Sequence, residues 1–556
     1  MNWKILNKVK ENRPDDIVRA ILENRGLKTK KEISEFLHPK DPVDFTAEDL
    51  GIDSRQVKKA IARINKAIQN NERIIVYGDY DADGICSTAI LWETLYSFTK
   101  NVLPYIPERV TEGYGLNENT LNRLIDKVQN LKLIITVDNG ITAADKIKVA
   151  KELGIDVIIC DHHQLGAVVP ECEAIVHTDK ICAAAISWFL AKEILKTTNS
   201  SLQPDYYLDL AAIATITDLE PLIGVNRSFV KYGLEVLNNT NRCGLLAIMQ
   251  EAGIQPGTVG TYEIGYIIGP RLNAMGRMES AMESLRLVCT RKDDQAKSLA
   301  EKLGLTNKER QVLTEETAKH ARELLLAEAK EDLPKLIFVS HESYQEGIIG
   351  LAAGRLTEEF YRPAIVVSRG EIHSKASARS VSGFNIIEAI RTQSDLLIDA
   401  GGHPMAAGFT VETAKIELLK QKLLEEAERQ ISQDILQKTQ KIDLELPLEA
   451  ISMELWEALT KLTPFGLGNY EPVFKCAAVV KDFRVVGSTG KHLKLTLAAG
   501  GKTYSAIAFG LGYLAEKLVM GKDVEVAFSL TLNVWNGKTN LELKVKDLKI
   551  KEESVF

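Results

Sequence analysis

The chain has 556 residues, of which 45% are hydrophobic and 26% are charged, and its formal net charge is −7. These values are ordinary for a globular protein, and a chain of this length is expected to form about three or four domains. It has no apolar run of the roughly 18 residues that span a bilayer and no signal-peptide pattern, so we expect a cytoplasmic protein without a membrane segment. Its seven cysteines form no CxxC pair, which argues against disulfides and a zinc ribbon.

The first half of the chain predicts a parallel α/β sheet. Residues 1–48 are charged and helix-forming, and they end in a proline-punctuated linker, HPKDPVDF. From 49 to 280, short apolar runs alternate with amphipathic helical patterns, as in βαβ units. Three of the runs, IIVY, LIITV and VIIC, are bounded by Gly, Asp or Asn and are typical of buried parallel strands.

Acidic residues and histidines follow these predicted strands in the motifs GDYDADG (78–84), TVDNG (136–140) and CDHH (160–163). A fourth motif, ITDLEPL (216–222), adds another acid. The carboxyl ends of parallel strands meet at one edge of a sheet, where open α/β proteins bind their ligands. We therefore expect one site that contains Asp79, Asp81, Asp83, Asp138, Asp161, His162, His163 and Asp218.

The residue types of this predicted site indicate a metal centre. Crowded carboxylates repel one another and are tolerated where a cation lies between them. Mixed Asp and His ligands suit Mn²⁺ better than an all-oxygen calcium site, with Mg²⁺ as the alternative. Two such ions about 3.5–4 Å apart are the usual arrangement for hydrolysing a phosphodiester. Each motif alone is typical of a turn, loop or helix cap, so the prediction of two divalent ions rests on all four together.

Beyond residue 280 the pattern changes twice. Residues 281–330 are rich in Ala, Leu, Glu and Lys, which predicts a long helical connector between two lobes. Residues 331–434 return to buried strands around a helical segment and predict a second α/β lobe. Residues 435–556 alternate apolar and polar side chains between glycine-containing turns, which predicts a small antiparallel barrel of the OB type. The candidate single-strand contacts in this barrel are Lys491, His492, Lys494, Trp535 and Lys538.

Several residues outside the acidic motifs are candidates for phosphate binding, because an Arg guanidinium binds phosphate oxygens through two parallel hydrogen bonds. PRLNAMGR (270–277) is a dense polar patch, and SARS (377–380) places alternate side chains on one face of a strand. The glycine pairs of AGGHPMAAG (400–408) allow the backbone to approach a ligand closely. The candidate substrate-binding residues are Arg109, Arg271, Asn273, Arg277, Ser377, Arg379 and His403.

The order of these motifs resembles that of the DHH phosphoesterase superfamily and, within it, the RecJ family of single-strand-specific DNA exonucleases. The resemblance continues beyond the acidic motifs and covers nearly the whole chain, through IPERVTEGYGL (106–116), IGPRLNAMGRMES (268–280), SARS, AGGHPMAAG and PFGLGNYEPVF (464–474). It implies a DHH catalytic domain (49–280), a DHHA1 substrate-binding domain (331–434) and a nucleic-acid-binding OB-fold (435–556).

The resemblance also implies an activity and roles for the site residues. The implied activity is a metal-dependent exodeoxyribonuclease that degrades single-stranded DNA from 5′ to 3′ in DNA repair and recombination. The implied protein is a monomer, with a single-strand-binding protein and a helicase as partners. The implied metal ligands, among which Asp138 bridges the ions, are Asp79, Asp81, Asp83, Asp138, His162 and Asp218. His163 then joins the catalytic residues Asp81, Asp83, Asp138 and His162 as a phosphate contact or proton donor, and Asp161 orients a histidine.

Two segments depart from the pattern of that family. Tyr344 and Gln345 stand where Trp-His is usual, which bears on substrate contacts, and CAAAIS (182–187) replaces a glycine-rich helix start. The acidic composition also keeps two alternatives open. One is a DHH-DHHA1 phosphodiesterase that acts on oligoribonucleotides, cyclic dinucleotides or pyrophosphate, and the barrel after residue 435 argues against it. The other is a non-catalytic DHH scaffold, and the complete ligand set argues against it.

Overall fold

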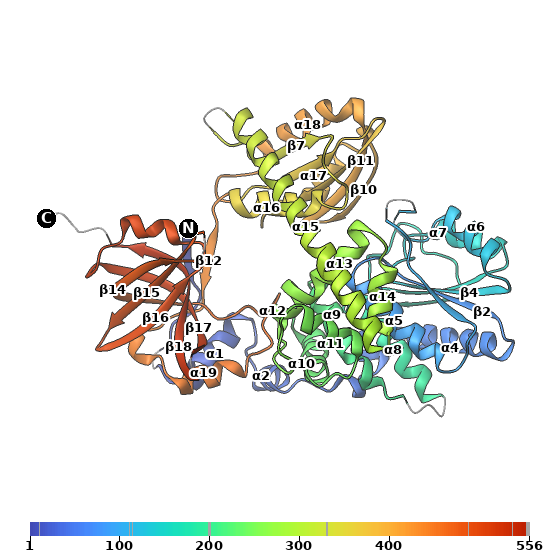
Figure 1. Cartoon of the computed structure of the whole chain (residues 1–556), viewed down its shortest axis with the longest axis horizontal. Helices are drawn as coiled ribbons and strands as arrows, with labels where there is room; N and C mark the ends of the chain where they lie inside the picture. Colours follow the sequence, from blue (N-terminus) through green and yellow to red (C-terminus); the bar gives the residue numbers. More distant parts are fainter. Residues whose placement is uncertain are drawn as a thin grey trace.

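Two α/β lobes and a β-barrel surround a long helix (Figure 1). The barrel lies at one end of the molecule with the N-terminus beside it, and the first lobe lies at the other end. This computed structural model describes residues 1–9, 12–109, 112–113, 115–197, 202–329, 332–487, 489–535 and 537–551. Within these ranges, no helix is both long and apolar enough to cross a membrane.

The first lobe contains a parallel sheet with the strand order β3-β2-β4-β5-β6, as the apolar runs predicted. Its strands are β2 (Arg73–Tyr77), β3 (Val102–Tyr105), β4 (Leu131–Val137), β5 (Asp156–Asp161) and β6 (Ala174–His177). Apolar side chains point to both faces of the sheet and are buried under helices on each side. The helices are α4 (Ser54–Gln69), α5 (Ala82–Tyr96) and α8 (Ala183–Lys196) on one face and α6 (Glu118–Lys127) and α7 (Ala144–Glu152) on the other.

After β6, the described part of the first lobe consists of helices up to residue 289, whereas alternating strands and helices were predicted up to residue 280. The segment begins with α8 and continues with α9 (Leu208–Thr217), which is buried on nearly all sides, as its continuous apolar sequence requires. The helices that follow are α10 (Gly224–Asn238), α11 (Cys243–Glu251), α12 (Thr261–Glu263), a π-helical turn (Ile264–Ile268), α13 (Gly269–Met278) and α14 (Met282–Cys289).

A single helix, α15 (Asp293–Glu328), connects the two lobes. Its 36 residues span about 54 Å at 1.5 Å per residue. Its first half packs on α11 and α13 and its second half on α16 (Ile349–Phe360) of the second lobe. This is the helical connector that the sequence predicted.

The second lobe has a mixed sheet with the order β10-β11-β9-β8-β7. Strands β7 (Ile337–His341) and β8 (Ala364–Ser368) are parallel, and the remaining neighbours are antiparallel. The antiparallel strands are β9 (His373–Arg379), β10 (Leu397–His403) and β11 (Ala406–Glu412). Helices α17 (Ile386–Arg391) and α18 (Ile416–Gln430) pack against the sheet.

The C-terminal region is a closed five-stranded barrel, which confirms the predicted OB-like fold. Closure follows from pairing between the first and fourth strands, in addition to the neighbouring pairs. The strands are β14 (Phe474–Val486), β15 (His492–Ala499), β16 (Lys502–Ala508), β17 (Asp523–Trp535) and β18 (Lys538–Ile550). The short strand β13 (Leu444–Glu445) pairs in parallel with β14, and α19 (Met453–Thr460) lies against the barrel core.

The N-terminal segment packs with the barrel rather than with the lobe that follows it in sequence. Its first residues form a strand, β1 (Asn2–Ile5), which pairs in parallel with β12 (Thr439–Ile442). Helix α1 (Pro14–Asn24) contributes Ile17, Ile21 and Leu22 to the barrel core, and α2 (Lys30–Leu37) packs at its edge. The two ends of the chain therefore form one structural unit, and deleting the barrel alone would expose an apolar face of α1.

One buried guanidinium joins this unit to the first lobe. Arg227 of α10 is 1% exposed, and burial lowers its pKa to about 10, so it is charged at neutral pH. It donates hydrogen bonds to backbone carbonyl oxygens at Phe36 (2.8 Å), Thr463 (2.6 Å) and Leu462 (3.1 Å). Its guanidinium also lies over the ring of Phe36. A single side chain thus fixes α2 and the segment before the barrel against the first lobe.

We predict that Arg227→Met lowers the free energy of unfolding by about 3 kcal/mol or more, because several buried carbonyl oxygens lose a charged donor. Urea unfolding of the whole chain measures the change. Arg55→Met is the control, since Arg55 is exposed and bonds to its neighbour Asp53, and it should change stability by less than about 1 kcal/mol. Equal stability of the Arg227→Met protein and the parent would contradict this account.

Candidate metal centre and substrate cleft

The turn after β2 places three acids at the edge of the sheet. Asp81 caps the N-terminus of α5 by accepting hydrogen bonds from the backbone N–H groups of Asp83 (3.0 Å) and Gly84 (3.1 Å). A Cβ atom on Gly84 would lie 2.5 Å from the backbone oxygen of Asp79, so only glycine allows the chain to fold back this tightly. The GDYDADG motif is therefore a compact turn that presents Asp79, Asp81 and Asp83 together.

Asp83 is held by the N-terminus of α8. Its carboxylate accepts hydrogen bonds from the backbone N–H groups of Ala183 (2.8 Å) and Ala184 (2.7 Å). The N-terminus of a helix favours negative charge because its first N–H groups have no partner within the helix. The CAAAIS segment, which departs from the expected glycine-rich start, therefore retains this contact, because backbone groups rather than side chains make it.

The next two strands add Asp138 and the two histidines. Asp138 follows β4 with a left-handed backbone (φ 62°), and its N–H donates to the Cys160 oxygen of β5 (3.0 Å). Asp161, the last residue of β5, accepts a hydrogen bond from the Ile141 N–H (2.9 Å) and contacts Nδ1 of His163 (2.7 Å). This contact fixes the ring of His163, which is the geometry that the predicted orienting role of Asp161 requires.

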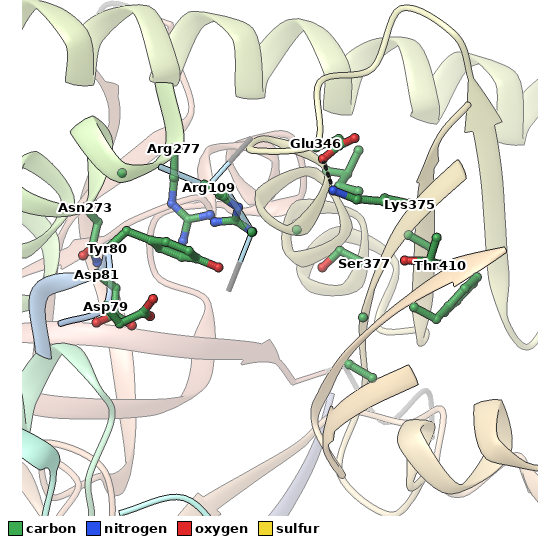
Figure 2. Close-up of a pocket in the computed structure, with 18 of the residues that line it drawn as sticks. Asp79, Tyr80, Asp81, Arg109, Asn273, Arg277, Glu346, Lys375, Ser377 and Thr410 are labelled. Atoms are coloured by element: carbon green, nitrogen blue, oxygen red, sulfur yellow. Dashed lines mark hydrogen bonds and ion pairs between the residues drawn. The ribbon is translucent and has the colours of Figure 1, made fainter. Parts of the chain in front are cut away.

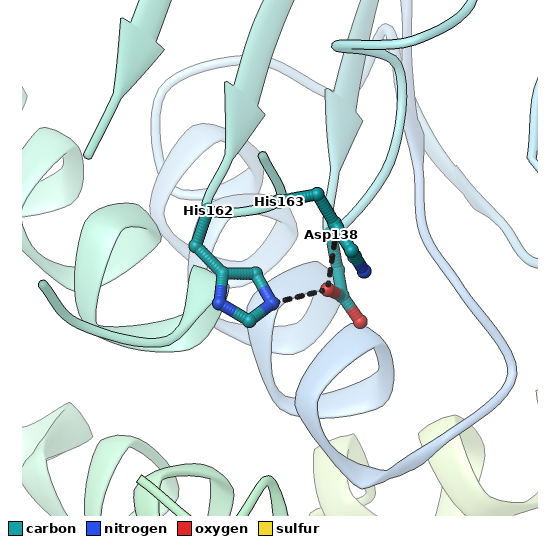
Figure 3. Close-up of side chains that lie close together, drawn as sticks. All are labelled: Asp138, His162 and His163. Atoms are coloured by element: carbon teal, nitrogen blue, oxygen red, sulfur yellow. Dashed lines mark ion pairs between the residues drawn. The ribbon is translucent and has the colours of Figure 1, made fainter. Parts of the chain in front are cut away.

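His162 faces Asp138 (Figure 3) and lies near two further acids. Its Nε2 atom is 3.3 Å from Asp138 Oδ1, 3.8 Å from Asp83 Oδ2 and 3.7 Å from Asp218 Oδ2. Among the described residues, three groups of side chains each have their ligand atoms within 4.8 Å of one another, and Asp138 belongs to two of these groups. The groups are Asp79, Asp81 and Asp138; Asp83, His162 and Asp218; and Asp138, His162 and His163. The arrangement fits two adjacent cations with Asp138 between them.

The electrostatics of this cluster call for positive charge. Burial raises the pKa of Asp79 and of Asp138 well above the usual value, and repulsion by neighbouring acids raises both further. Burial and then Asp83 raise the pKa of Asp218 to about 8. Burial acts to lower the pKa of His162, but Asp138 and Glu220 outweigh it and raise the pKa to about 12. Asp79 Oδ1 is buried without a hydrogen-bond partner among the described residues, as expected of an atom that binds a cation.

A cleft of about 560 Å³ opens from the acids toward the second lobe (Figure 2). Asp79, Tyr80 and Asp81 line one wall, and Lys375, Ser377 and Thr410 from β9 and β11 line the facing wall. Of the predicted site residues, those that line the cleft are Asp79, Asp81, Arg109, Asp138, His163, Asp218, Asn273, Arg277, Ser377 and Arg379. Asp83 and His162 lie in the acidic cluster beneath it.

Three arginines converge at the cleft from different segments. Burial and then the charges of Arg109, Arg310 and Arg379 lower the pKa of Arg277 to about 10. Burial and then Arg109 likewise lower the pKa of Arg379, whose guanidinium donates to Ser377 Oγ (3.2 Å). Mutual repulsion of this kind favours an anion between the arginines. The predicted phosphate contacts Arg109, Arg277, Ser377 and Arg379 are therefore brought together.

Arg271 is a correction to the predicted substrate contacts. Its guanidinium is turned toward α11 and pairs with Glu251 Oε2 at 2.6 Å, and it does not line the cleft. Sequence spacing did not reveal this partner, because Glu251 lies on another helix. Asn273 has a double role, since it lines the cleft and its Oδ1 accepts a hydrogen bond from the Ala82 N–H at the start of α5 (2.7 Å).

Other predicted residues take peripheral positions. His403 lies outside the cleft lining, and burial and then the charges of His163 and His162 lower its pKa. Tyr344 is buried and bonds His320 on α15 (3.0 Å), and Gln345 is exposed. Neither of these departures lines the cleft.

The barrel candidates are only partly described. Lys494 pairs with Glu542, and His492 packs edge-on against the exposed ring of Phe509. Lys491 is exposed. The side chains of Trp535 and Lys538 lie outside those that the structure describes.

Two functional candidates were missed in the sequence. Glu220 Oε1 lies 3.6 Å from Nδ1 of His162, on the ring atom opposite the one that faces the acids. A carboxylate at this position fixes the orientation of a metal-binding histidine. Tyr80 lines the cleft, and Arg109 lies over its ring at 5.0 Å. Glu220 lies two positions after Asp218, and Tyr80 lies one position after Asp79. Their place within the acidic motifs could therefore have identified both residues from the sequence.

Removal of metal should make stability depend on pH in a defined direction. Acids with a raised pKa and a histidine with a raised pKa both bind protons on folding, so the free energy of unfolding of the metal-free protein falls as pH rises. The window for Asp218 runs from about 4 to about 8, and that for His162 from about 6.5 to about 12. We predict a lower melting temperature at pH 8 than at pH 6 in EDTA and recovery with Mn²⁺. Asp138→Asn should flatten this dependence, and higher stability at pH 8 than at pH 6 in EDTA would contradict it.

Comparisons with known proteins agree with this geometry. Three domain families match the chain: the DHH family N-terminal domain at residues 73–215, the DHHA1 domain at 333–433 and the RecJ OB domain at 442–547. The single-stranded-DNA-specific exonuclease RecJ of Bacillus subtilis is 36% identical over 97% of this chain and 69% of its own length. RecJ of Thermus thermophilus is 33% identical over 89% of this chain and 71% of its own length.

Solved structures give the same result. The crystal structure of Thermus thermophilus RecJ in complex with Mn²⁺ superposes with a TM-score of 0.83 at 28% identity, covering 99% of this chain and 80% of that one. The structure of the same protein with Mg²⁺ superposes with a TM-score of 0.77 at 27% identity, covering 99% and 79%. Similarity of this extent, through every domain and in the same order, shows that the chain belongs to the RecJ family.

Proposed function

We propose that the chain is a metal-dependent exonuclease that degrades single-stranded DNA from its 5′ end, in DNA repair and recombination. The observation that carries the proposal is that an acidic cluster and a group of arginines line the same cleft. A cluster of buried acids and histidines that fits two cations lies on one side, and converging arginines that fit a phosphate lie beside and opposite it. The similarity to proteins named single-stranded-DNA-specific exonucleases supplies the class of substrate.

Six side chains would hold the ions. Asp79, Asp81 and Asp138 form one group, and Asp83, His162 and Asp218 form the other, with Asp138 between them. Mixed oxygen and nitrogen ligands suit Mn²⁺, and related structures contain Mn²⁺ or Mg²⁺. Such ions lower the pKa of bound water and neutralise charge that develops on the phosphate.

The remaining residues position the substrate. Arg109, Arg277 and Arg379 bind phosphate oxygens, and the Ser377 hydroxyl lies within hydrogen-bond distance of Arg379, so it contacts the same phosphate. Asp161 holds Nδ1 of His163, which leaves the other ring nitrogen for the cleft that His163 lines. His163 is thus placed to contact the scissile phosphate or to give a proton to the leaving oxygen.

The barrel is the proposed binding module for the rest of the strand. OB-folds bind single strands through aromatic platforms and basic grooves, and the RecJ OB domain matches this region. A single-strand-binding protein and a helicase as partners, a monomeric state and the 5′-to-3′ direction belong to the proposal through family membership. The barrel argues against a nuclease for short oligoribonucleotides or cyclic dinucleotides, because such small substrates do not require a second binding module. The complete cluster of candidate ligands argues against a non-catalytic scaffold, which does not require one.

One assay tests the proposal directly. The protein is incubated with 5′-labelled single-stranded DNA, duplex DNA, RNA and a dinucleotide, each with Mn²⁺ or Mg²⁺. We expect mononucleotide release from single-stranded DNA and much slower reaction of the duplex and RNA. Preferential hydrolysis of the dinucleotide would assign the chain to small substrates instead.

Asp138→Ala should lower kcat by roughly 10³-fold or more while the fold and DNA binding are kept. A bridging carboxylate acts through both ions, so its loss removes about 4 kcal/mol or more of transition-state stabilisation. Asp145→Ala, at an exposed acid of α7, is the control and should retain activity. Turnover of the Asp138→Ala protein near the parent rate at saturating Mn²⁺ would remove Asp138 from the centre.

Arg379→Ala should reduce kcat/KM on 5′-phosphorylated strands about tenfold more than on 5′-hydroxyl strands. Charge-assisted hydrogen bonds to a terminal phosphate dianion are present in only one of the two substrates. Arg391→Ala, at an exposed arginine of the same lobe, is the matched control. Equal losses on the two substrates would instead place Arg379 on an internal phosphate.

A further inference from the structure

A second cavity adjoins the substrate cleft. It has a volume of about 600 Å³, and Asn273 and Arg277 line both cavities. Its other walls come from the end of α9, the helical segment α12–α13 and the loop 465–471 before the barrel. A smaller cavity shares Phe465 and Glu471 with it and reaches Leu530–Leu532 on β17 of the barrel. The three cavities thus adjoin one another between the acidic cluster and the barrel, and we call this row of cavities the trough.

Two exposed tyrosines lie at the wall of the trough. Tyr262 is 61% exposed and Tyr266 is 72% exposed, and their rings are stacked with centroids 5.0 Å apart at an interplanar angle of 26°. Tyr470, which is 63% exposed, lines the same cavity from the loop before the barrel. Single exposed aromatic side chains are common on protein surfaces. Several that gather beside an apolar cavity, as here, are typical of a binding surface.

The backbone that carries the tyrosine pair is specialised. Pro270 has no N–H and would clash with the carbonyl group of Tyr266 in a regular α-helix, so the chain widens into the π-helical turn Ile264–Ile268. On the adjoining face, a Cβ atom on Gly269 would clash with Thr217 at the end of α9. The glycine therefore brings the turn close to the segment that carries Asp218. The two tyrosines of this turn line the cavity beside that segment.

The charges along the trough suit a polyanion with apolar bases. Arg277 and Arg310 line the cavity, and Arg310 Nε is buried without a hydrogen-bond partner among the described residues. The two acids in the lining are already engaged, since Glu220 contacts His162 and Glu471 pairs with Lys546 at 2.9 Å. Arginine beside stacked aromatic rings is the combination that holds single strands without reading their sequence.

We propose that Tyr262 and Tyr266 form a stacking platform for bases of single-stranded DNA on the 3′ side of the nucleotide held in the cleft. This inference rests on the proposed function and identifies the route of the strand between the metal centre and the barrel. The platform binds bases through their faces, so it is indifferent to sequence and contributes to the binding of longer strands. A dinucleotide does not reach it.

The test compares substitutions that keep or remove the rings. All proteins carry Asp138→Ala so that the strand is not consumed, and binding of 5′-phosphorylated oligothymidylates of two and twelve nucleotides is measured by fluorescence anisotropy. The double variant Tyr262→Leu with Tyr266→Leu should bind the longer strand about tenfold or more weakly and the dinucleotide unchanged. Tyr262→Phe with Tyr266→Phe should bind both as the parent does. Tyr96→Leu, at an exposed tyrosine of α5 whose ring lies tilted against that of Trp92, is the control.

Abasic strands separate stacking from other causes of weaker binding. Replacing the bases at positions three to six by abasic sites should weaken binding by the parent but not by the leucine variant, because the platform has then already been lost. If the leucine variant binds the long strand as tightly as the parent does, the inference is overturned and the tyrosines are reassigned to a protein partner. If the protein without the tyrosine substitutions neither binds nor, with Asp138 restored, degrades single-stranded DNA, the proposed function falls together with the inference.

Discussion

The confinement of five carboxylates and a histidine in one cluster at the edge of a parallel sheet is the constraint on which the rest of the structure depends. Because strands β2, β4 and β5 end side by side, Asp79, Asp138 and His162 meet there although they are far apart in sequence. Burial and mutual repulsion raise the pKa of the acids, so the cluster is unfavourable without bound cations. Neighbouring groups limit this cost: the N-terminus of α8 holds Asp83, and the tight glycine turn fixes Asp79. The fold therefore contains an acidic cluster that bound cations would stabilise.

The second constraint is the distance between the acids of the candidate metal centre and the arginines of the proposed phosphate site. If both sets lay on one surface without a gap, they would pair with one another and leave neither free for a substrate. The structure separates them across a cleft, with Ser377 and Arg379 on the second lobe and the acids on the first. Helix α15 sets this separation, because it packs on both lobes along its length. Arg277 and Arg109 remain on the acidic side, but they repel Arg379, which keeps the opening favourable for an anion.

The sequence predicted those features that local patterns determine. Apolar runs followed by acids placed Asp79, Asp138 and Asp161 at strand ends, and alternation predicted the barrel. Features that depend on a partner distant in sequence escaped it. Arg271 was placed with the substrate because nothing in PRLNAMGR indicates Glu251, and Glu220 was overlooked although it contacts His162. The packing of α1 in the barrel core was also unpredictable, since a 400-residue separation leaves no local signal. The glycine-rich start replaced by CAAAIS proved immaterial to Asp83, because backbone groups make that contact.

The junction between the barrel and the first lobe follows from the same reasoning. Binding in the trough orders a flexible strand, and this costs conformational entropy. The contacts that offset the cost form only if the walls of the trough keep their relative position. Arg227 fixes the segment 461–464, and the Leu222 N–H donates to the Leu467 oxygen at 2.7 Å, which docks the following loop on the residues after Asp218. The loop that carries Tyr470 is thereby anchored to the segment that carries Asp218, a proposed metal ligand. Positioning of the strand and positioning of the metal centre thus depend on one set of contacts, so loosening the junction should impair long strands before it impairs the chemistry.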